Sequence, residues 1–170
     1  SITDGQIFLE SDLFFSGMRP AVNVGLSVSR VGGAAQTKAM KKAAGSIRID
    51  LAQYREMEVF TQFSSDLDAS TKEMLQYGRG LMELLKQPLC EPLTMEDQVI
   101  TLCAVTGRLL LQIPLEQQKK FQKEMLAWFH TAQPDIINEL ELQKDLGEEL
   151  KNRILEAVKC FRETWKKQGE

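Results

Sequence analysis

The sequence predicts a mainly α-helical protein, with a short strand-and-loop segment over residues 1–30 followed by a helical bundle over residues 31–170. Three observations support this. Apolar residues recur every three or four positions through most of the sequence after residue 31, which is the spacing of amphipathic helices. Several of these stretches begin with a helix-start signal. The 43% hydrophobic and 26% charged residues in 170 suit a globular fold with one main core.

The N-terminal segment predicts a short strand around residues 6–9, then turns at Gly17 and Pro20, and a loop that ends at Arg30. No partner strand is visible for this strand. Its unpaired backbone N–H and C=O groups would therefore seek an adjoining sheet. We expect the chain to be the C-terminal part of something larger.

Two helices are expected after Arg30. Gly32 and Gly33 precede the run 34–40, which is typical of a glycine-started helix. The next helix carries an apolar stripe at helical spacing, made of Ile47, Leu51, Tyr54, Phe60 and Phe63.

Two capping boxes mark the following helices. Ser70 and Glu73 form the first, in which the serine oxygen accepts a free backbone N–H and the glutamate reaches back. Thr94 repeats the pattern. The predicted core residues behind these boxes are Met74, Leu81 and Leu85 for the first helix, and Val99, Leu102, Cys103, Thr106 and Leu110 for the second.

The last part of the sequence predicts two more helices in an antiparallel bundle. Pro114 suits a first turn, where its missing N–H is not needed, and Phe121, Met125 and Phe129 line one face. The final helix has the clearest stripe, consisting of Leu146, Leu150, Ile154, Val158, Phe161 and Trp165.

Composition excludes several classes of site. Cys90, Cys103 and Cys160 are too few and too irregularly spaced for a disulfide framework or a zinc site, so we expect reduced, mostly buried thiols. The only histidine, His130, lies beside Trp128 and is expected to be structural. No apolar run approaches the roughly 18 to 20 residues that cross a bilayer, and the first residues do not form a cleavable signal. Any membrane association would be through partners.

Charge is uneven along the sequence. The net charge of −3 argues against a general nucleic-acid binder, yet residues 19–55 hold seven basic residues against the single acidic Asp50. This stretch could face phosphate, a nucleic-acid backbone or an acidic partner. A solvated helix face is the plainer interpretation.

Residues 19–30 read RPAVNVGLSVSR, a loop of small residues that ends at Arg30 just before an alanine-rich helix. The segment resembles the alpha subunit of the F-type, or rotary, ATP synthase. The resemblance begins at Ser1 and continues through residues 51–56, 65–68 and 83–87, and it fades to a hydrophobic pattern beyond about residue 95. The catalytic beta subunit usually has aspartate where this chain has Asn23, and differs at residues 24–27.

The resemblance implies that residues 1–30 are the last strand and loop of an α/β P-loop nucleotide-binding domain. Arg30 would be an arginine finger that reaches ATP bound by the neighbouring beta subunit, with Val28 and Ser29 setting its backbone. Ser27 matches a loop serine regarded as needed for activity, and Ser1 matches a serine that faces the catalytic phosphate site. Such a finger typically accelerates phosphoryl transfer about 10³- to 10⁵-fold.

A non-catalytic nucleotide site is implied as well. Phe14, Arg19, Pro20 and Gln87 match positions around its adenine. A second glutamine that often follows two residues later is Leu89 here, which weakens the expected adenine contacts. ATP or ADP with Mg²⁺ would be bound in the full assembly, but the sequence has no Gly-x-x-x-x-Gly-Lys-Ser/Thr motif and no expected magnesium ligand. We therefore expect the isolated chain neither to bind ATP tightly nor to hydrolyse it.

The resemblance also implies partners and location. The beta subunit would be the direct partner, with gamma and delta subunits in a complex that uses a proton gradient to make ATP. That complex would sit at the cytoplasmic face of a bacterial plasma membrane, or the equivalent face of an organelle membrane, and would reach the membrane only through its proton-channel sector.

Plainer roles and other functions also fit the residues alone. Arg30 could be a surface arginine at a helix start, Ser1 and Ser27 turn serines, Gln87 a polar loop residue and Phe14 part of the core. A helical protein-interaction module would present an exposed apolar groove. A nucleic-acid-binding helical domain would use the 19–55 stretch and show steep salt dependence.

Overall fold

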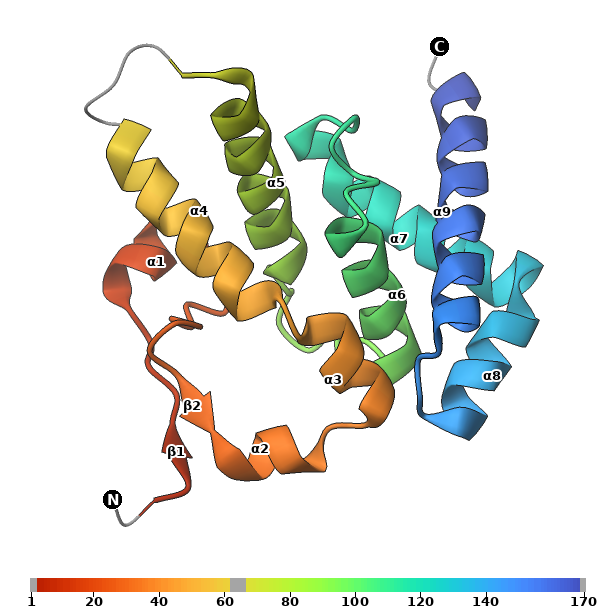
Figure 1. Cartoon of the computed structure of the whole chain (residues 1–170), viewed down its shortest axis with the longest axis horizontal. Helices are drawn as coiled ribbons and strands as arrows, with labels where there is room; N and C mark the ends of the chain where they lie inside the picture. The colour runs from red at the N-terminus through yellow and green to blue at the C-terminus, as the bar shows by residue number, and fades with distance from the viewer. Residues whose placement is uncertain (1–2, 62–66, 169–170) are drawn as a thin grey trace.

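The computed structural model describes residues 3–61 and 67–168, and it confirms a mainly helical fold with one small two-stranded sheet in that part of the protein (Figure 1). The elements, in sequence order, are β1 (Gly5–Gln6), α1 (Ser11–Phe15), β2 (Val28–Ser29), α2 (Arg30–Ala35), α3 (Lys38–Ala44), α4 (Ile47–Thr61), α5 (Ala69–Leu85), α6 (Met95–Thr106), α7 (Leu115–Ala132), α8 (Pro134–Gln143) and α9 (Glu148–Gln168).

The N-terminal strand has a partner within the chain. β1 pairs antiparallel with β2, with Gly5 opposite Ser29 and Gln6 opposite Val28. The expectation of a strand without an internal partner is therefore wrong, because the loop before Arg30 folds back to supply one. The two backbones approach so closely that a Cβ on Gly5 would lie 2.0 Å from the Val28 carbonyl oxygen.

The helix expected over residues 34–40 is interrupted. α2 ends at Ala35, Gln36 takes an extended conformation, and α3 begins at Lys38. Thr37 causes the restart, because its side-chain oxygen accepts a hydrogen bond from the Met40 N–H at 3.2 Å, as N-cap residues do.

α4 and α5 form an antiparallel helical hairpin (Figure 1). Ile47, Leu51 and Tyr54 are buried as predicted. Phe60 is 61% exposed, so extending the stripe to it is wrong: six residues beyond Tyr54 is about 1.7 turns, which places the two side chains on different sides of the helix. Phe63 lies outside the described residues.

The two predicted capping boxes have different outcomes. Asp68, two residues before Ser70, caps α5 by accepting from the Thr71 N–H at 2.9 Å. The Thr71 side chain, the Thr71 N–H and the Ser70 hydroxyl all interact with the Asp68 carboxylate and lower its pKa. Ser70 is therefore not the cap. Thr94 caps α6 as predicted, accepting from the Asp97 N–H at 3.2 Å.

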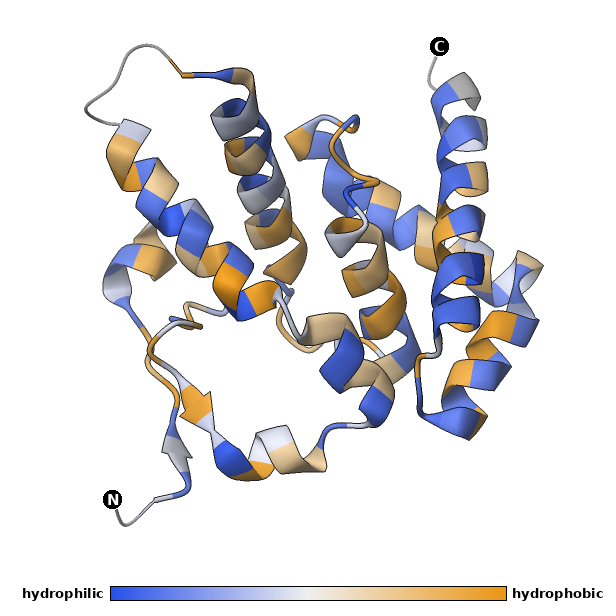
Figure 2. Cartoon of the chain, in the orientation of Figure 1, coloured by the Kyte–Doolittle hydropathy of each residue, from blue (hydrophilic) through white to orange (hydrophobic). Residues whose placement is uncertain are grey.

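The core follows the predicted stripes with small shifts. Leu81 is fully buried, but Leu75 replaces Met74 on the buried face of α5. The other predicted core residues that are buried are Val99, Cys103, Leu110, Phe121, Met125, Phe129, Leu146, Leu150, Ile154 and Val158. Figure 2 shows that hydrophobic residues occur only at intervals along α9, as expected for a helix with one buried face.

The bundle is not antiparallel throughout. Gly107, just after α6, lies next to Leu155, and the Lys151 charge acts on Cys103 one turn earlier in both helices. α6 and α9 therefore run in the same direction, and α7 crosses them (Figure 1). The separate short helix α8 was not predicted, although Pro134 in its first turn is a helix-start signal.

The cysteines differ from the expected burial. Cys103 is buried, whereas Cys90 and Cys160 are exposed. Burial raises the pKa of the Cys103 thiol to about 11. Among residues 3–61 and 67–168, no helix has the length and apolar character that a bilayer crossing requires.

Candidate functional site

Arg30 is the first residue of α2, and its side chain is exposed. Its Nη2 lies 3.6 Å from an Asp4 carboxylate oxygen, and both side chains are 72% exposed. An ion pair this exposed contributes at most about 1 kcal/mol. The guanidinium can therefore leave Asp4 for another anion, while the Arg30 backbone N–H stays bound to the Asp4 carbonyl at 3.1 Å.

Val28 and Ser29 hold the backbone immediately before Arg30. Both belong to β2, and their pairing with β1 fixes the direction of the backbone. The Ser29 side-chain oxygen also accepts from the Gly32 N–H at 3.0 Å. Ser29 therefore caps the helix that Arg30 opens.

Ser27 uses its hydroxyl within the loop. Its Oγ donates to the Asn23 carbonyl at 2.6 Å and accepts from the Phe8 N–H at 3.0 Å. The structure thus places Ser27 where it fastens the loop to the segment after β1. Ser1 lies outside the described residues.

Asn23 lies at the centre of the loop and is only 6% exposed. Its Oδ1 accepts from the Leu26 N–H at 3.1 Å and from Arg55 Nη1 at 3.0 Å. Its Nδ2 donates to Glu10 Oε1 at 2.7 Å. Neither Glu10 nor Arg55 was predicted as a site residue.

A second arginine of α4 also holds the loop. Arg48 Nη2 donates to the Gly25 carbonyl at 2.8 Å. Arg48 and Arg55 are seven residues apart, which is two helical turns, so they share one face of α4. Their spacing within the basic stretch could have indicated from the sequence that both arginines contact the same segment, which here is the loop at Asn23 and Gly25.

Four other predicted residues form a cluster beside the bundle. The Arg19 guanidinium carbon lies 4.4 Å from the centre of the Phe14 ring, within range of a cation–π contact. The Gln87 N–H donates to the Arg19 carbonyl at 2.9 Å, and Pro20 follows Arg19 through a cis peptide bond. Phe14 is 46% exposed and so is not a core residue.

A groove of about 740 Å³ adjoins this cluster, with Arg19 and Gln87 among its lining residues. Lys119 lies in it and donates to the carbonyls of Leu84 and Lys86 at the end of α5. Burial lowers the pKa of Lys119. The groove is therefore polar on its α5 side, where these hydrogen bonds also hold the segment that leads to Gln87.

The single histidine lines the same groove. His130 Nε2 lies 2.8 Å from Asp97 Oδ1, which ties α7 to the first turn of α6. This contact agrees with the structural role expected for His130.

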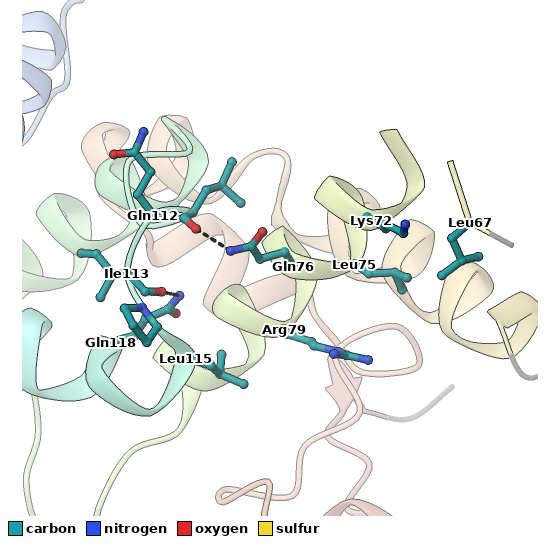
Figure 3. Close-up of a pocket in the computed structure, with 11 residues that line it drawn as sticks. Leu67, Lys72, Leu75, Gln76, Arg79, Gln112, Ile113, Leu115 and Gln118 are labelled. Atoms are coloured by element: carbon teal, nitrogen blue, oxygen red, sulfur yellow. Dashed lines mark hydrogen bonds between the residues drawn. The ribbon is translucent and has the colours of Figure 1, made fainter. Parts of the chain in front are cut away.

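A different cleft of about 580 Å³ lies between α5 and the turn before α7, and none of the predicted site residues line it. Figure 3 shows Gln76 donating to the Leu111 carbonyl and Gln118 donating to Ile113. Gln118 Oε1 is buried and has no hydrogen-bond partner among the described residues.

Acidic, histidine and cysteine side chains within the described ranges form no group of three or more that could hold a metal ion. The site residues offer groups suited to recognition. Arg30 provides a fixed set of donors suited to phosphate oxygens, and Phe14 with Arg19 and Gln87 provides a flat apolar face beside polar groups.

Comparison with known proteins shows which family the sequence matches. The family described as ATP synthase alpha/beta chain, C terminal domain, matches residues 36–161. The ATP synthase subunit alpha of Aquifex aeolicus is 52% identical over 163 residues, covering 96% of this chain and 32% of that protein. The subunit alpha of Acetivibrio thermocellus is 52% identical over 165 residues, with 97% and 33% covered. That of Mycobacterium tuberculosis is 50% identical over 162 residues, with 95% and 30% covered.

The chain therefore spans about a third of the length of these curated relatives. The similarity also continues well past residue 95, beyond which the sequence alone indicated only a hydrophobic pattern. The family match covers more than half of the sequence, and the resemblance to alpha subunits seen at residues 19–30 is confirmed by these relatives. The protein belongs to the ATP synthase alpha/beta family, whose C-terminal domain it carries, and the relatives named above are alpha subunits.

Proposed function

We propose that this chain is the part of an ATP synthase alpha subunit that supplies Arg30 in trans to a nucleotide bound by the neighbouring beta subunit. The observation that carries the proposal is the contrast at Arg30. Its backbone is fixed by β2 and by the Asp4 carbonyl, while its guanidinium is 72% exposed and, among the residues that the structure describes, forms a weak ion pair with Asp4.

This arrangement suits an arginine finger. Guanidinium is charged at every physiological pH and offers several donors in a rigid fork. A fixed backbone lowers the entropy lost when the side chain engages phosphate. A trans finger stabilises the charge that develops during phosphoryl transfer and is worth about 10³- to 10⁵-fold in rate.

A second nucleotide contact would come from the cluster at Phe14, Arg19, Pro20 and Gln87. Their proximity supports a place beside an adenine ring, which stacks on flat apolar or guanidinium surfaces. Leu89 stands where a second glutamine is often found, so this contact would be weaker than in relatives that have both. The phosphates and Mg²⁺ of ATP or ADP would be bound by parts of the assembly outside this chain.

Exposed apolar side chains support burial of the N-terminal segment in a larger assembly. Figure 2 shows hydrophobic residues in β2 and in the stretch between β1 and α1. Exposed apolar residues of this segment and of the adjoining turns of α1 and α2 include Ile7, Phe8, Leu9, Phe15, Leu26, Val28 and Val31. Exposed apolar side chains of this kind are typical of an interaction surface, and we propose that they contact the rest of the nucleotide-binding domain. Residues 1–30 would be the end of that domain, and residues 31–170 would form the helical domain that follows it.

In the assembled machine, alpha and beta subunits would alternate in a ring with gamma and delta subunits, and would make ATP from ADP and phosphate with a proton gradient. The ring would be peripheral, at the cytoplasmic face of a bacterial plasma membrane or the equivalent organelle face. Contact with the membrane would run through the proton-channel sector. The isolated chain, which lacks a P-loop, would not hydrolyse ATP.

The test uses the full-length alpha subunit reconstituted with beta and gamma. Arg30→Ala is expected to lower the ATPase kcat about 10³- to 10⁵-fold without changing assembly measured by size-exclusion chromatography. Arg30→Lys, which keeps the charge but loses the fork, should fall between wild type and Arg30→Ala. Lys38→Ala, which removes another exposed cation of the same basic stretch, is the matched control and should turn over like wild type.

Retention of near-normal kcat by Arg30→Ala in a fully assembled complex would contradict the proposal. So would loss of assembly itself, since the side chain would then have an interface role instead of a role in the reaction.

A further inference from the structure

We propose that Asn23 and Arg55 are the positioning residues for Arg30, and that the amide of Asn23, paired with the carboxylate of Glu10, sets the geometry of the whole 23–29 loop. This inference rests on the proposed function of Arg30, because it concerns how that side chain is brought to its place.

The side-chain amide of Asn23 is used both as a donor and as an acceptor. Asn23 donates from Nδ2 to Glu10 and accepts at Oδ1 from Arg55 and from the Leu26 N–H. An aspartate offers acceptors only. At this buried position it would set a second carboxylate oxygen about 2.7 Å from Glu10 Oε1, where like charges repel strongly. The site therefore requires an amide as long as Glu10 is present.

A continuous set of hydrogen bonds leads from Asn23 to Arg30. The Asn23 carbonyl accepts from both the N–H and the Oγ of Ser27. Ser27 Oγ in turn accepts from Phe8. Val28 and Ser29 then pair with β1, and Ser29 caps the helix at Arg30. The backbone from Asn23 to Arg30 is therefore held at Asn23, Ser27, Val28 and Ser29, so a shift at Asn23 would change the position from which Arg30 starts.

The same loop is fastened to the helical bundle. Arg55 reaches Asn23 and Arg48 reaches the Gly25 carbonyl, and both come from one face of α4. α4 packs against α5 within the bundle. The bundle therefore holds the 23–29 loop in place, and Arg55 is the charged residue of the bundle that contacts the Asn23 amide.

The experiment uses the reconstituted full-length assembly and exchanges the two partners. Asn23→Asp is expected to lower the ATPase kcat at least tenfold with less than a threefold change in KM for ATP. Glu10→Gln should lower kcat less than threefold, because its amide oxygen still accepts from Asn23. The double variant Asn23→Asp with Glu10→Gln restores a donor–acceptor pair with reversed direction and should recover at least half of the lost activity on a logarithmic scale.

Arg55 is tested alongside. Arg55→Ala should lower kcat about tenfold, and Arg55→Lys should retain part of the activity because a lysine can donate one hydrogen bond to Asn23. Gln53→Ala, an exposed neighbour on α4, is the matched control. Thermal unfolding of each assembly is recorded, since a purely structural role would make kcat follow the melting temperature and would not give rescue by the exchanged pair.

The outcomes separate this inference from the proposed function. If Arg30→Ala keeps its activity, the proposed function fails. If Arg30→Ala loses activity while Asn23→Asp does not, or while the exchanged pair shows no rescue, the positioning role is overturned. Should Asn23→Asp alone fail to fold, the double variant and Arg55→Lys carry the same comparison.

Discussion

At the scale of single residues, the site depends on how each polar group is used. Ser27, Ser29 and Asn23 direct their side chains inward to the loop's own backbone. Arg30 directs its side chain outward, toward a partner that holds it only weakly. A loop whose internal polar groups are satisfied can present one charged side chain at a defined position, because each buried group left unpaired would cost about 1 to 3 kcal/mol.

The resemblance identified the exposed candidates Arg30, Arg19 and Gln87, but not the groups that hold them. Asn23 and Arg55 are 32 positions apart, and no spacing rule links residues that meet only after the loop folds onto α4. Glu10 gave no signal either, because a single glutamate near a short helix is common on a protein surface. Long-range contacts of this kind follow from tertiary packing rather than from local pattern.

The thiols give a prediction at this scale. In the native protein at pH 8, Cys90 and Cys160 should be alkylated by iodoacetamide quickly, and Cys103 slowly. Cys103 is buried, and burial raises the pKa of its thiol to about 11, so the reactive thiolate is scarce at that pH. Mass spectrometry after a short exposure should show two modified sites.

Addition of denaturant should add the third modification. Fast labelling of Cys103 in the folded protein would contradict its place between α6 and α9.

At the scale of secondary-structure elements, periodicity predicted the buried faces well and the breaks poorly. The stripes of α7 and α9, and that of α4 as far as Tyr54, were right because burial of one helical face follows directly from spacing. The division between α2 and α3 was not predicted, since it depends on Thr37 capping a new helix within a run of good helix formers. The Asp68 cap was missed for a related reason. Asp68 and Ser70 lie within one turn and both can cap a helix, and Asp68 is the cap because α5 begins at Ala69.

The α4–α5 hairpin gives a prediction at this scale. A Cβ on Gly78 would lie 2.2 Å from the ring of Tyr54, so Gly78→Ala should push the two helices apart. Overpacking of this kind typically costs about 1 to 3 kcal/mol, and urea denaturation followed by circular dichroism should show a lower midpoint.

Gly33→Ala is the control for that change. Among the described residues, and apart from its chain neighbours and the backbone of its own helix, no atom lies within 4 Å of a Cβ built there. Alanine favours a helix over glycine by about 1 kcal/mol, so the midpoint should stay or rise. Equal midpoints for Gly78→Ala and wild type would show that α4 and α5 are packed less closely than described.

At the scale of the whole molecule, the protein joins a well-buried bundle to an N-terminal segment whose apolar side chains are exposed. α3 to α9 share one core, whereas Ile7, Leu9 and Phe15 are exposed. The two parts are connected by the α4 arginines that hold the 23–27 loop. The bundle thus acts as a rigid support, and the exposed segment carries the residues proposed to meet a nucleotide.

Arg30 is proposed to act on a nucleotide held by another subunit. The most direct measurement is a structure of the assembled ring, with the full-length alpha subunit and a nucleotide plus a phosphoryl-transfer analogue. We expect a guanidinium nitrogen of Arg30 at hydrogen-bond distance, about 3 Å, from an oxygen of the analogue in the neighbouring beta subunit, with the Asn23 hydrogen bonds intact. An Arg30 that remains paired with Asp4, or that points into solvent while the analogue is bound, would contradict it.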